Sequence, residues 1–149
     1  MYKRQSKKKS IFINGAISTS FISDSIKKHQ SKTSIGAHSI FLGQVRADII
    51  NNKAVRAIDY TAQEELSNKV VHIIRENTFR KFNLNCLHIY HSLGLVDVGE
   101  ICLFVFASSS RRKECQKAIE YIVEEIKSKV PIFGKEIFND TSHQWKVNN

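Results

Sequence analysis

The chain has 149 residues, 42% of them hydrophobic and 25% charged, which is typical of one globular domain that buries its own core. No apolar run approaches the ~20 residues of a membrane-spanning helix, and the basic N-terminus lacks the apolar segment of a secretory signal, so we expect a cytoplasmic protein. Its three cysteines have no Cys-x-x-Cys spacing, which argues against a disulfide framework and against a zinc site.

The N-terminus carries much of the formal net charge of +9. Five cations supply +5 with no acid nearby, and such a run is typical of a solvated arm. We therefore predict a flexible basic arm over residues 1–10 and one domain over residues 11–149. The domain itself is mildly basic, which suits an anionic small substrate or an acidic partner as well as it suits RNA. The five cations are Lys3, Arg4, Lys7, Lys8 and Lys9.

The first half of the domain alternates short apolar runs with polar loops. Residues 11–13 predict an edge strand, and the helical spacing of Phe21, Ile22 and Ile26 predicts a short helix that ends near His29. A polar loop follows over residues 31–36, and then an apolar strand over residues 39–45. The Asn-Asn pair at 51–52 predicts a hairpin turn, because asparagine tolerates a positive φ, with the returning strand over residues 54–60.

The second half contains two long helical patterns. A helix is predicted over residues 64–80, with an apolar stripe made by Leu66, Val70, Ile73, Ile74 and Phe79. Strands over residues 84–91 and 101–107 are joined by a link over residues 93–100. A final helix runs from about residue 111 to residue 129, and Pro131 ends it. The core side of this helix is predicted to hold Cys115, Ala118, Ile119, Ile122 and Ile126. Two long helices and hairpin-linked strands predict an α+β domain with an antiparallel sheet.

Lys127 is the first candidate for chemistry. It lies one turn beyond Val123 at the edge of the apolar stripe, so its stem can pack on the core while its amine enters a partly dry cleft. Desolvation and nearby arginines would favour the neutral, nucleophilic amine there. The alternative is a surface lysine that complements the dipole of the helix C-terminus.

Arginines supply the other candidate anion contacts. Arg111 and Arg112 follow a serine run, and a serine N-cap with free backbone N–H groups and an arginine fork suits phosphate. The alternative is a solvated first turn, although arginine there opposes the helix dipole. Arg46, at the end of a strand, is either a cleft residue or the first exposed side chain after it.

The histidines do not predict a metal site. His88 and His91 are three apart on a strand, so their side chains point to opposite faces. Cys86 and Cys102 lie in apolar runs and are interpreted as packed small hydrophobes. The other histidines are interpreted as scattered: His29, His38, His72 and His143.

From residue 36 to residue 145 the sequence resembles the large, catalytic subunit of molybdopterin synthase. The matching stretches are Gly36-Ala37 before Phe41-Leu42-Gly43-Gln44-Val45-Arg46, then His91-Ser92-Leu93-Gly94 before Gly99-Glu100, then residues 109–112, 127–136 and Trp145. The order and spacing of these stretches carry the resemblance over roughly three quarters of the chain.

The resemblance implies an α/β-hammerhead fold and a sulfur-transfer reaction that needs neither a metal nor an organic cofactor. The family converts cyclic pyranopterin monophosphate (precursor Z) into molybdopterin by installing two dithiolene sulfurs. The sulfur arrives as a thiocarboxylate on the C-terminal Gly-Gly of a small ubiquitin-like subunit, whose tail enters the large subunit. The resemblance also implies a central dimer of large subunits with one small subunit on each flank.

The resemblance also implies roles for individual residues. Lys127 matches the family's essential lysine, a general acid/base or a transient covalent anchor for the pterin. Arg46 matches an arginine that lines the same pocket, and Arg112 matches one that grips substrate phosphate across the dimer interface. Phe41 is expected near the inserted tail, and Lys135 is a further catalytic candidate. The substrate-binding set implied is Gln44, Val45, Arg46, Arg111, Arg112, Lys127, Gly134, Lys135 and Glu136.

The chain departs from the family pattern at two positions. Arg111 stands where the family commonly has histidine, so a permanent cation replaces a titratable imidazole. Gly134-Lys135 stands where the family commonly has two basic residues, so the second active-site lysine is missing unless Lys135 or Lys129 substitutes. These replacements bear on proton transfer and rate more than on substrate binding.

Two other functions remain open at this point. The basic arm and the high pI suggest a nucleic-acid-binding module, although no strand combines aromatic and basic residues in the manner of an RNA-binding sheet. Arg111 and Gly134 also suggest a scaffold of the same family that binds the small subunit but turns over poorly.

Overall fold

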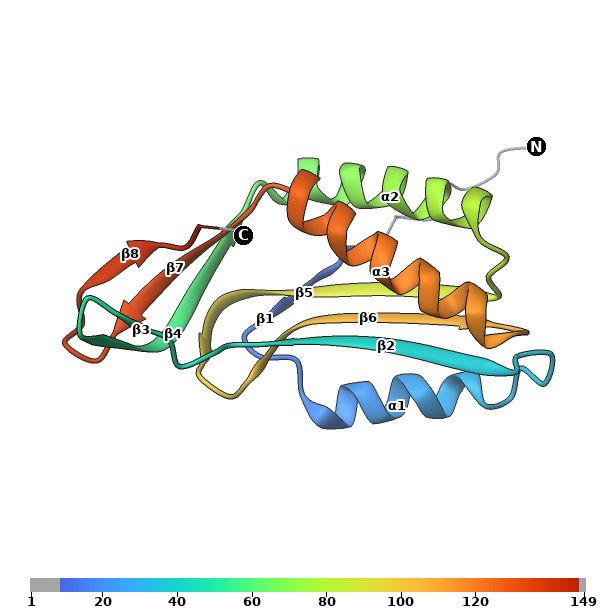
Figure 1. Cartoon of the computed structure of the whole chain (residues 1–149), viewed down its shortest axis with the longest axis horizontal. Coiled ribbons are helices and arrows are strands. Elements are labelled where there is room, and N and C mark those ends of the chain that lie inside the picture. The colour runs from blue at the N-terminus through green and yellow to red at the C-terminus, as the bar shows by residue number, and fades with distance from the viewer. Residues whose placement is uncertain (1–8, 148–149) are drawn as a thin grey trace.

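The computed structural model describes residues 9–147, so most of the predicted basic arm lies outside the described part of the chain. A single sheet is covered by helices on its two faces (Figure 1). The elements follow one another as β1 (Phe12–Asn14), α1 (Thr19–His29), β2 (Ala37–Gln44), β3 (Ile49–Ile50), β4 (Lys53–Ala62), α2 (Glu64–Lys81), β5 (Cys86–Asp97), β6 (Ile101–Ser109), α3 (Arg112–Lys129), β7 (Ile132–Phe138) and β8 (His143–Trp145).

The sheet is antiparallel apart from one pair of strands, which confirms the predicted α+β class. Its strand order is β2-β6-β5-β4-β7-β8, with β3 added to β4. The exception is β1, which pairs with β5 in parallel, with Phe12 opposite His91. β5 is the central element, because its first half pairs with β6 and its second half pairs with β4. Strands β3, β4, β7 and β8 therefore extend away from the helices at one end of the molecule (Figure 1).

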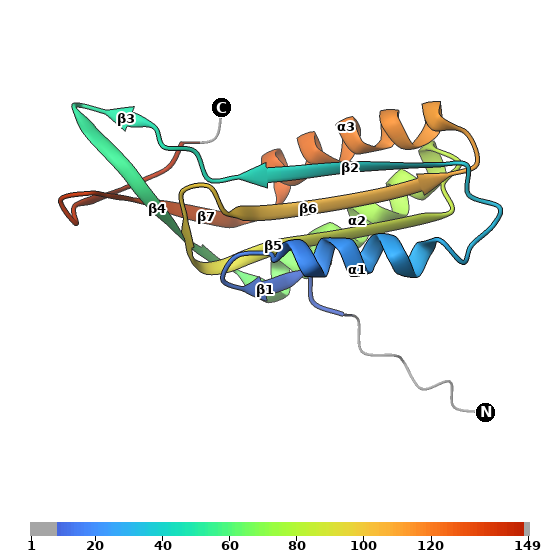
Figure 2. The ribbon, with the colours of Figure 1, turned by 90° about the horizontal axis from the view of Figure 1, so that it is seen from below.

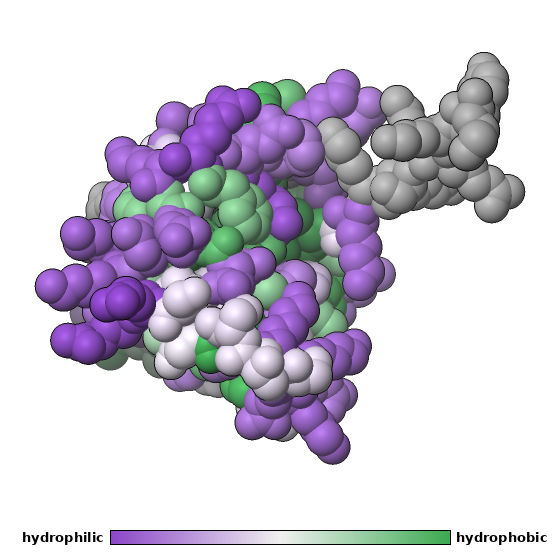
Figure 3. All heavy atoms as spheres, turned by 90° about the vertical axis from the view of Figure 1, so that its right-hand side faces the viewer, coloured by the Kyte–Doolittle hydropathy of each residue, from purple (hydrophilic) through white to green (hydrophobic). Residues whose placement is uncertain are grey.

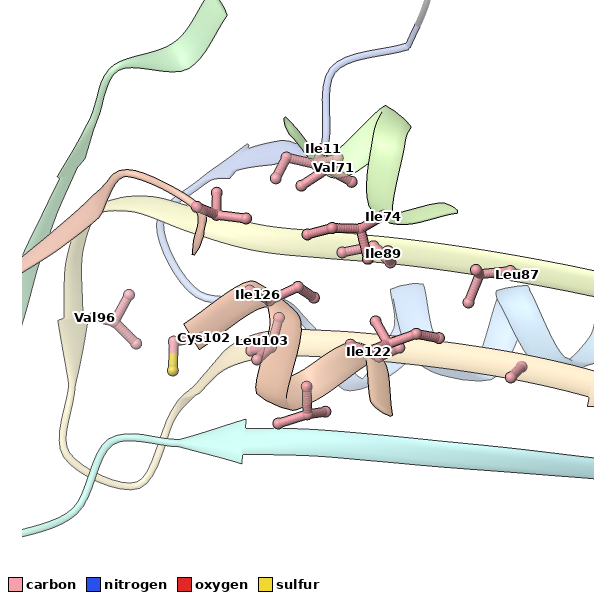
Figure 4. Packing of buried hydrophobic residues seen from close by; sticks show 14 of the residues in the cluster. Ile11, Val71, Ile74, Leu87, Ile89, Val96, Cys102, Leu103, Ile122 and Ile126 are labelled. Atoms are coloured by element: carbon pink, nitrogen blue, oxygen red, sulfur yellow. The ribbon is translucent and has the colours of Figure 1, made fainter. Parts of the chain in front are cut away.

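Two apolar cores lie on opposite faces of the sheet. Helices α2 and α3 cover one face and α1 covers the other (Figures 1 and 2). Alternation along β6 divides its side chains: Leu103 and Val105 belong to the large core under α2 and α3, and Phe104 and Phe106 to the small core under α1. Figure 4 shows the large core, in which Ile122 and Ile126 of α3 pack over β5 and β6.

The local signals in the sequence mark the turns and ends correctly. Asn51 and Asn52 both adopt a positive φ, of 51° and 63°, in the turn between β3 and β4. Val130, the C-cap of α3, is extended as expected of a residue before proline, and its N–H still donates to the Ile126 carbonyl. Cys86, Cys102 and Cys115 are free and buried, as interpreted. Among residues 9–147, no helix is long and apolar enough to cross a membrane.

The predicted apolar stripe of α2 is wrong for three of its five members, although Ile74 is buried and Val70 packs against the core. Leu66, Ile73 and Phe79 are exposed by 47%, 55% and 40%, whereas the inward face carries Ser67, Val71, Ile74 and Thr78. The hydroxyls of Ser67 and Thr78 can be buried because each donates a hydrogen bond to a backbone carbonyl. Ser67 Oγ donates to Pro131 at 3.3 Å, and Thr78 Oγ1 donates to Ile74 at 2.6 Å.

Two boundaries also differ from the prediction. The expected link over residues 93–100 is mostly strand, because β5 continues to Asp97 and pairs there with β4. The N-cap of α3 is Arg111, not a serine. Ser109 nevertheless binds this helix end, since its Oγ accepts from the Cys115 N–H at 3.1 Å and donates to the Arg111 carbonyl at 2.5 Å.

Candidate functional site

A pocket of about 130 Å³ lies where the C-terminal end of α3 meets β4, β5 and β7. Four residues predicted from distant parts of the sequence line it together: Phe41, Gln44, Lys127 and Gly134. The other lining residues are Gly43, Tyr60, His91, Cys102, Leu103, Ile126, Val130, Ile132 and Lys146. The volume of the pocket is smaller than the roughly 300–1,000 Å³ of a typical ligand-binding pocket, so it can hold a narrow chain or one part of a substrate.

Two lysines provide the positive charge of the pocket. Lys127 is an exposed residue of the last turn of α3, and Lys146 directly follows β8. The backbone fixes the position of Lys146, because its N–H donates to the Gly134 carbonyl at 2.7 Å. The two amines therefore come from elements on different sides of the pocket, which suits an anionic ligand between them.

The inner wall is formed by buried polar groups. His91 is only 8% exposed, its Nδ1 donates to the Ser92 carbonyl at 2.8 Å, and Nε2 is left as an acceptor. Burial, with a smaller contribution from the charge of Lys127, lowers the pKa of His91. The Tyr60 ring meets the His91 ring edge-on at 4.9 Å, and its hydroxyl donates to Cys102 Sγ at 3.4 Å.

Two glycines keep this wall close to its neighbours. A Cβ at Gly134 would lie 3.0 Å from Ile58 Cγ2 and 3.2 Å from Tyr60 Cε1, so a side chain at 134 would be tightly packed against both residues. A Cβ at Gly43 would lie 3.1 Å from Leu103 Cβ and 3.5 Å from Phe41 Cε1. Substituting Gly134 by lysine would therefore require Tyr60 to move.

Arg46, Val45 and Glu136 lie beside the pocket without lining it. Arg46 is exposed and donates to Asp48 from Nε at 2.8 Å, and this hydrogen bond raises the pKa of Arg46. Val45 is a core residue that is 1% exposed, so its side chain is not available to a substrate as predicted. Glu136 is 5% exposed, and its charge adds to the burial and to the Cys102 contact that raise the pKa of Tyr60.

Lys135 does not line the pocket, although it is a predicted catalytic residue. Side chains alternate along β7, and it is Ile132 and Gly134 that face the pocket. Lys135 therefore belongs to the opposite face of the strand. Lys129, the other suggested substitute for a second lysine, also lies outside the pocket, and its amine is 2.8 Å from a Glu125 carboxylate oxygen.

The predicted phosphate-binding pair lies at the other end of α3. Arg111 and Arg112 are exposed at its start, and at 1.5 Å per residue Arg112 is about 22 Å along the axis from Lys127. Figure 3 shows this end of the molecule, where hydrophilic side chains surround a smaller hydrophobic area. One chain therefore does not bring the arginines to Lys127.

The interpretation of His29 as scattered is wrong. His29 of α1 and His88 of β5 approach with their Nε2 atoms 2.9 Å apart. Burial above all lowers the pKa of His88, to about 4.

A larger hollow of about 300 Å³ lies beside His88, Arg75 and Asn68, but it contains none of the predicted site residues. We therefore place the candidate site in the smaller pocket.

Among the lining residues not predicted, four carry side chains that could bind or react: Tyr60, His91, Cys102 and Lys146. His91 and Cys102 lie in apolar runs, where burial is the ordinary interpretation. The alternation of β5 indicates that His91 and His88 face opposite sides, but not which side carries the pocket. Lys146 follows a short terminal strand without any recognisable pattern, so no sequence signal was available for it.

The family of the chain follows from its sequence. A family model described as MoaE protein matches residues 17–129. The chain belongs to this family. The molybdopterin synthase catalytic subunit of Dictyostelium discoideum is 36% identical over 121 residues, which cover 79% of this chain and 76% of that protein. The corresponding subunit of Emericella nidulans is 34% identical over 121 residues. That match covers 81% of this chain but only 62% of the fungal protein.

Solved structures share the fold. A molybdopterin synthase from Staphylococcus aureus superposes with a TM-score of 0.79 at 25% identity, covering 95% of this chain and 99% of that one. A complex of subunits 1 and 2 of the molybdopterin-converting factor from Helicobacter pylori contains a chain with a TM-score of 0.77 at 20% identity. That superposition covers 90% of this chain and 87% of the Helicobacter chain.

Proposed function

We propose that this protein is the catalytic subunit of a molybdopterin synthase. It transfers sulfur from the C-terminal thiocarboxylate of a small ubiquitin-like subunit to cyclic pyranopterin monophosphate, and so forms the dithiolene of molybdopterin. Family membership supports the reaction. The observation that carries the assignment of the site is that Phe41, Gln44, Lys127 and Gly134 line one pocket.

The dimensions of the pocket suit the sulfur donor. A tail that ends in two glycines has no side chains, so it fits a volume of about 130 Å³ that is too small for a complete drug-sized ligand. Phe41 offers an apolar contact to that tail, and Gln44 is exposed at the edge, where it can hydrogen-bond the peptide backbone. The Helicobacter complex gives a precedent for a small-subunit partner in this fold.

Lys127 is the residue to which we assign the chemistry. In this proposal its amine moves a proton at the pterin carbon that receives sulfur, or holds the pterin as a transient covalent adduct. His91 is buried behind it with an acceptor nitrogen free, so it is available to take a proton from the amine or from substrate.

Lys146 supplies the second amine of the site. In the family pattern a basic residue stands at the position of Gly134, where Ile58 and Tyr60 pack closely against the backbone in this chain. Lys146 lines the same pocket and is hydrogen-bonded through its backbone to Gly134. The positive charge is thus provided by the neighbouring strand end instead of by Lys135.

Substrate phosphate is held by Arg112 of a second copy of the chain. The distance of about 22 Å along α3 is too long for one pterin to touch Arg112 and Lys127 of the same subunit. In a two-fold dimer the same surface of each copy contributes to the other, so two equivalent composite sites form. Arg111 lies next to Arg112 and adds a permanent cation there.

The test is reconstitution with a thiocarboxylated small subunit and cyclic pyranopterin monophosphate, followed by detection of the dithiolene product. We expect turnover with the wild-type chain and with Lys129→Ala, which removes a neighbouring exposed lysine, and none with Lys127→Ala. Binding of the small subunit without product from the wild-type chain would indicate a scaffold. No binding of the small subunit, together with salt-dependent binding of RNA, would replace the proposal by a nucleic-acid function.

A further inference from the structure

Three metal-ligating side chains converge under the C-terminal end of α1, on the face of the sheet opposite α2 and α3. They are His29, the last residue of α1, and Cys86 and His88 of β5. One donor atom from each lies within 4.8 Å of the other two, and His29 and Cys86 are 8% and 7% exposed. This cluster is separate from the Lys127 pocket.

The topology explains why the cluster escapes a search of the sequence. Cys86 and His88 are two apart on a strand, so they share one face, and α1 packs on that face through the small core. His29 reaches them from 59 residues before His88. Such a set has no compact spacing motif, which is why the cysteine pattern alone argued against a zinc site.

Two of the three side chains already have the outer partners that orient metal ligands. His29 Nδ1 donates to the Ser25 carbonyl at 2.6 Å, which leaves Nε2 as a lone pair aimed at His88. A ligating histidine almost always donates its other nitrogen to a carbonyl or carboxylate in this manner. The Lys32 ammonium donates to Cys86 Sγ at 3.0 Å, and the thiolate is the form of cysteine that binds metals.

We propose that His29, Cys86 and His88 form a zinc site that fastens α1 to the sheet. Two imidazoles and a thiolate are preferred ligands of Zn²⁺, and the fourth position of the tetrahedron is taken by water. Binding displaces one proton from the Cys86 thiol and replaces the contact between the two imidazoles. The ion would join α1 to β5 away from the Lys127 pocket, so the site is independent of the proposed sulfur transfer.

The geometry needs only a small adjustment. Two nitrogens bound to a tetrahedral zinc at about 2.0–2.1 Å lie about 3.3 Å apart, so the Nε2 atoms must separate slightly from 2.9 Å. Cys86 Sγ must approach from within 4.8 Å, and Lys32 can keep donating to it. Arg75 and Lys9 are the other cations near His88, and Arg75 donates to the Leu87 carbonyl.

The experiment uses the full chain without a polyhistidine tag. The protein is stripped with a chelator, dialysed against Zn²⁺ or Mg²⁺, and its metal content is measured. We expect about one zinc ion per chain, no retained magnesium, and a higher melting temperature with zinc. Co²⁺ in place of zinc should give the near-ultraviolet charge-transfer band of a thiolate ligand.

Variants assign the ligands. Cys86→Ser should abolish the Co²⁺ charge-transfer band, and His88→Gln should abolish stoichiometric zinc retention. The matched controls, Cys115→Ser and His72→Gln, remove a buried thiol and an exposed imidazole elsewhere and should bind zinc as the wild type does. Wild-type protein that retains no zinc after dialysis, or ligand variants that bind as tightly as the controls, would overturn the proposal.

Alkylation keeps the test decisive if Cys86→Ser fails to fold. In the wild-type chain, zinc should slow iodoacetamide modification of Cys86, mapped by mass spectrometry, at least about tenfold, and should leave Cys102 and Cys115 unaffected. Equal modification of Cys86 with and without zinc would contradict a thiolate ligand.

Discussion

The two ends of α3 differ in what surrounds their positive charge. At the C-terminal end, Lys127 lines a pocket with a buried wall of His91 and Cys102. At the N-terminal end, Arg111 and Arg112 are exposed to solvent. One end has the features of a reaction site and the other those of a surface that binds an anion or a partner.

This difference indicates that the predicted site residues do not form a single cluster within one chain. A helix is rigid, so about 22 Å between Arg112 and Lys127 cannot be closed by side-chain motion. In the proposed function, the arginine end of one subunit meets the lysine end of another at each site. The predictions below test each end in turn.

The largest effect is expected at the lysine end. Lys127→Ala should lower turnover by a factor of roughly 10²–10⁴, because a group that moves a proton or forms an adduct is removed. Small-subunit binding and the dimer should be intact, since the side chain is exposed. Single-turnover kinetics with Lys129→Ala as control measures this, and wild-type rates in Lys127→Ala would refute its role.

The next largest effect is expected at the arginine end. Arg112→Ala should raise the KM for the pterin roughly tenfold or more, because a charge-assisted contact to phosphate contributes about 1.5–3 kcal/mol. Steady-state kinetics should show a much smaller change in kcat. A KM equal to that of the wild type would remove Arg112 from the phosphate site.

A smaller effect separates Lys146 from Lys135. Lys146→Ala should reduce kcat/KM about fivefold, since one hydrogen-bonding cation at the pocket contributes about 1 kcal/mol. Lys135→Ala is the matched variant on the other face of β7 and should retain wild-type kcat/KM. If Lys135→Ala lost more kcat/KM than Lys146→Ala, Lys135 and not Lys146 would be the second lysine of the site.

The smallest expected effect is on how the free energy of unfolding changes with pH. Burial lowers the pKa of His91 below its ordinary 6.5, so below pH 6.5 the unfolded chain binds more protons than the folded one. The free energy of unfolding should therefore fall as the pH drops below 6.5, and His91→Gln should make this fall shallower. Urea titrations at about pH 7.5 and about pH 5 measure it, with exposed His143→Gln as control. If the free energy of unfolding of His91→Gln depends on pH as steeply as that of the wild type, the conclusion that His91 is buried as a neutral imidazole would be contradicted.

Much of the fold could be predicted because its signals are local. Asn51-Asn52 required a positive φ, Pro131 ended α3, and the periodicity of α3 identified most of its buried face. Leu66, Ile73 and Phe79 of the α2 stripe were wrongly predicted because hydrophobic periodicity alone cannot detect that Ser67 and Thr78 satisfy their hydroxyls on the backbone and can be buried.

The site was only partly predictable. Lys127 and Gly134 came from a motif, but the wall made by Tyr60, His91 and Cys102 depends on how β4, β5 and β6 pair. Lys146 enters through one backbone hydrogen bond between strands. Contacts of this kind are set by tertiary registers, which residue spacing along the chain does not encode.

The most direct test of the composite site is a mixed dimer. Co-expression of Lys127→Ala and Arg112→Ala chains with two different affinity tags allows the heterodimer to be isolated and assayed at low pterin concentration. If each site joins Lys127 of one subunit to Arg112 of the other, one of the two sites is intact, and the heterodimer should have about half of the wild-type activity. If Lys127 and Arg112 act within one chain, no intact site remains, and the heterodimer should be no more active than the Arg112→Ala homodimer.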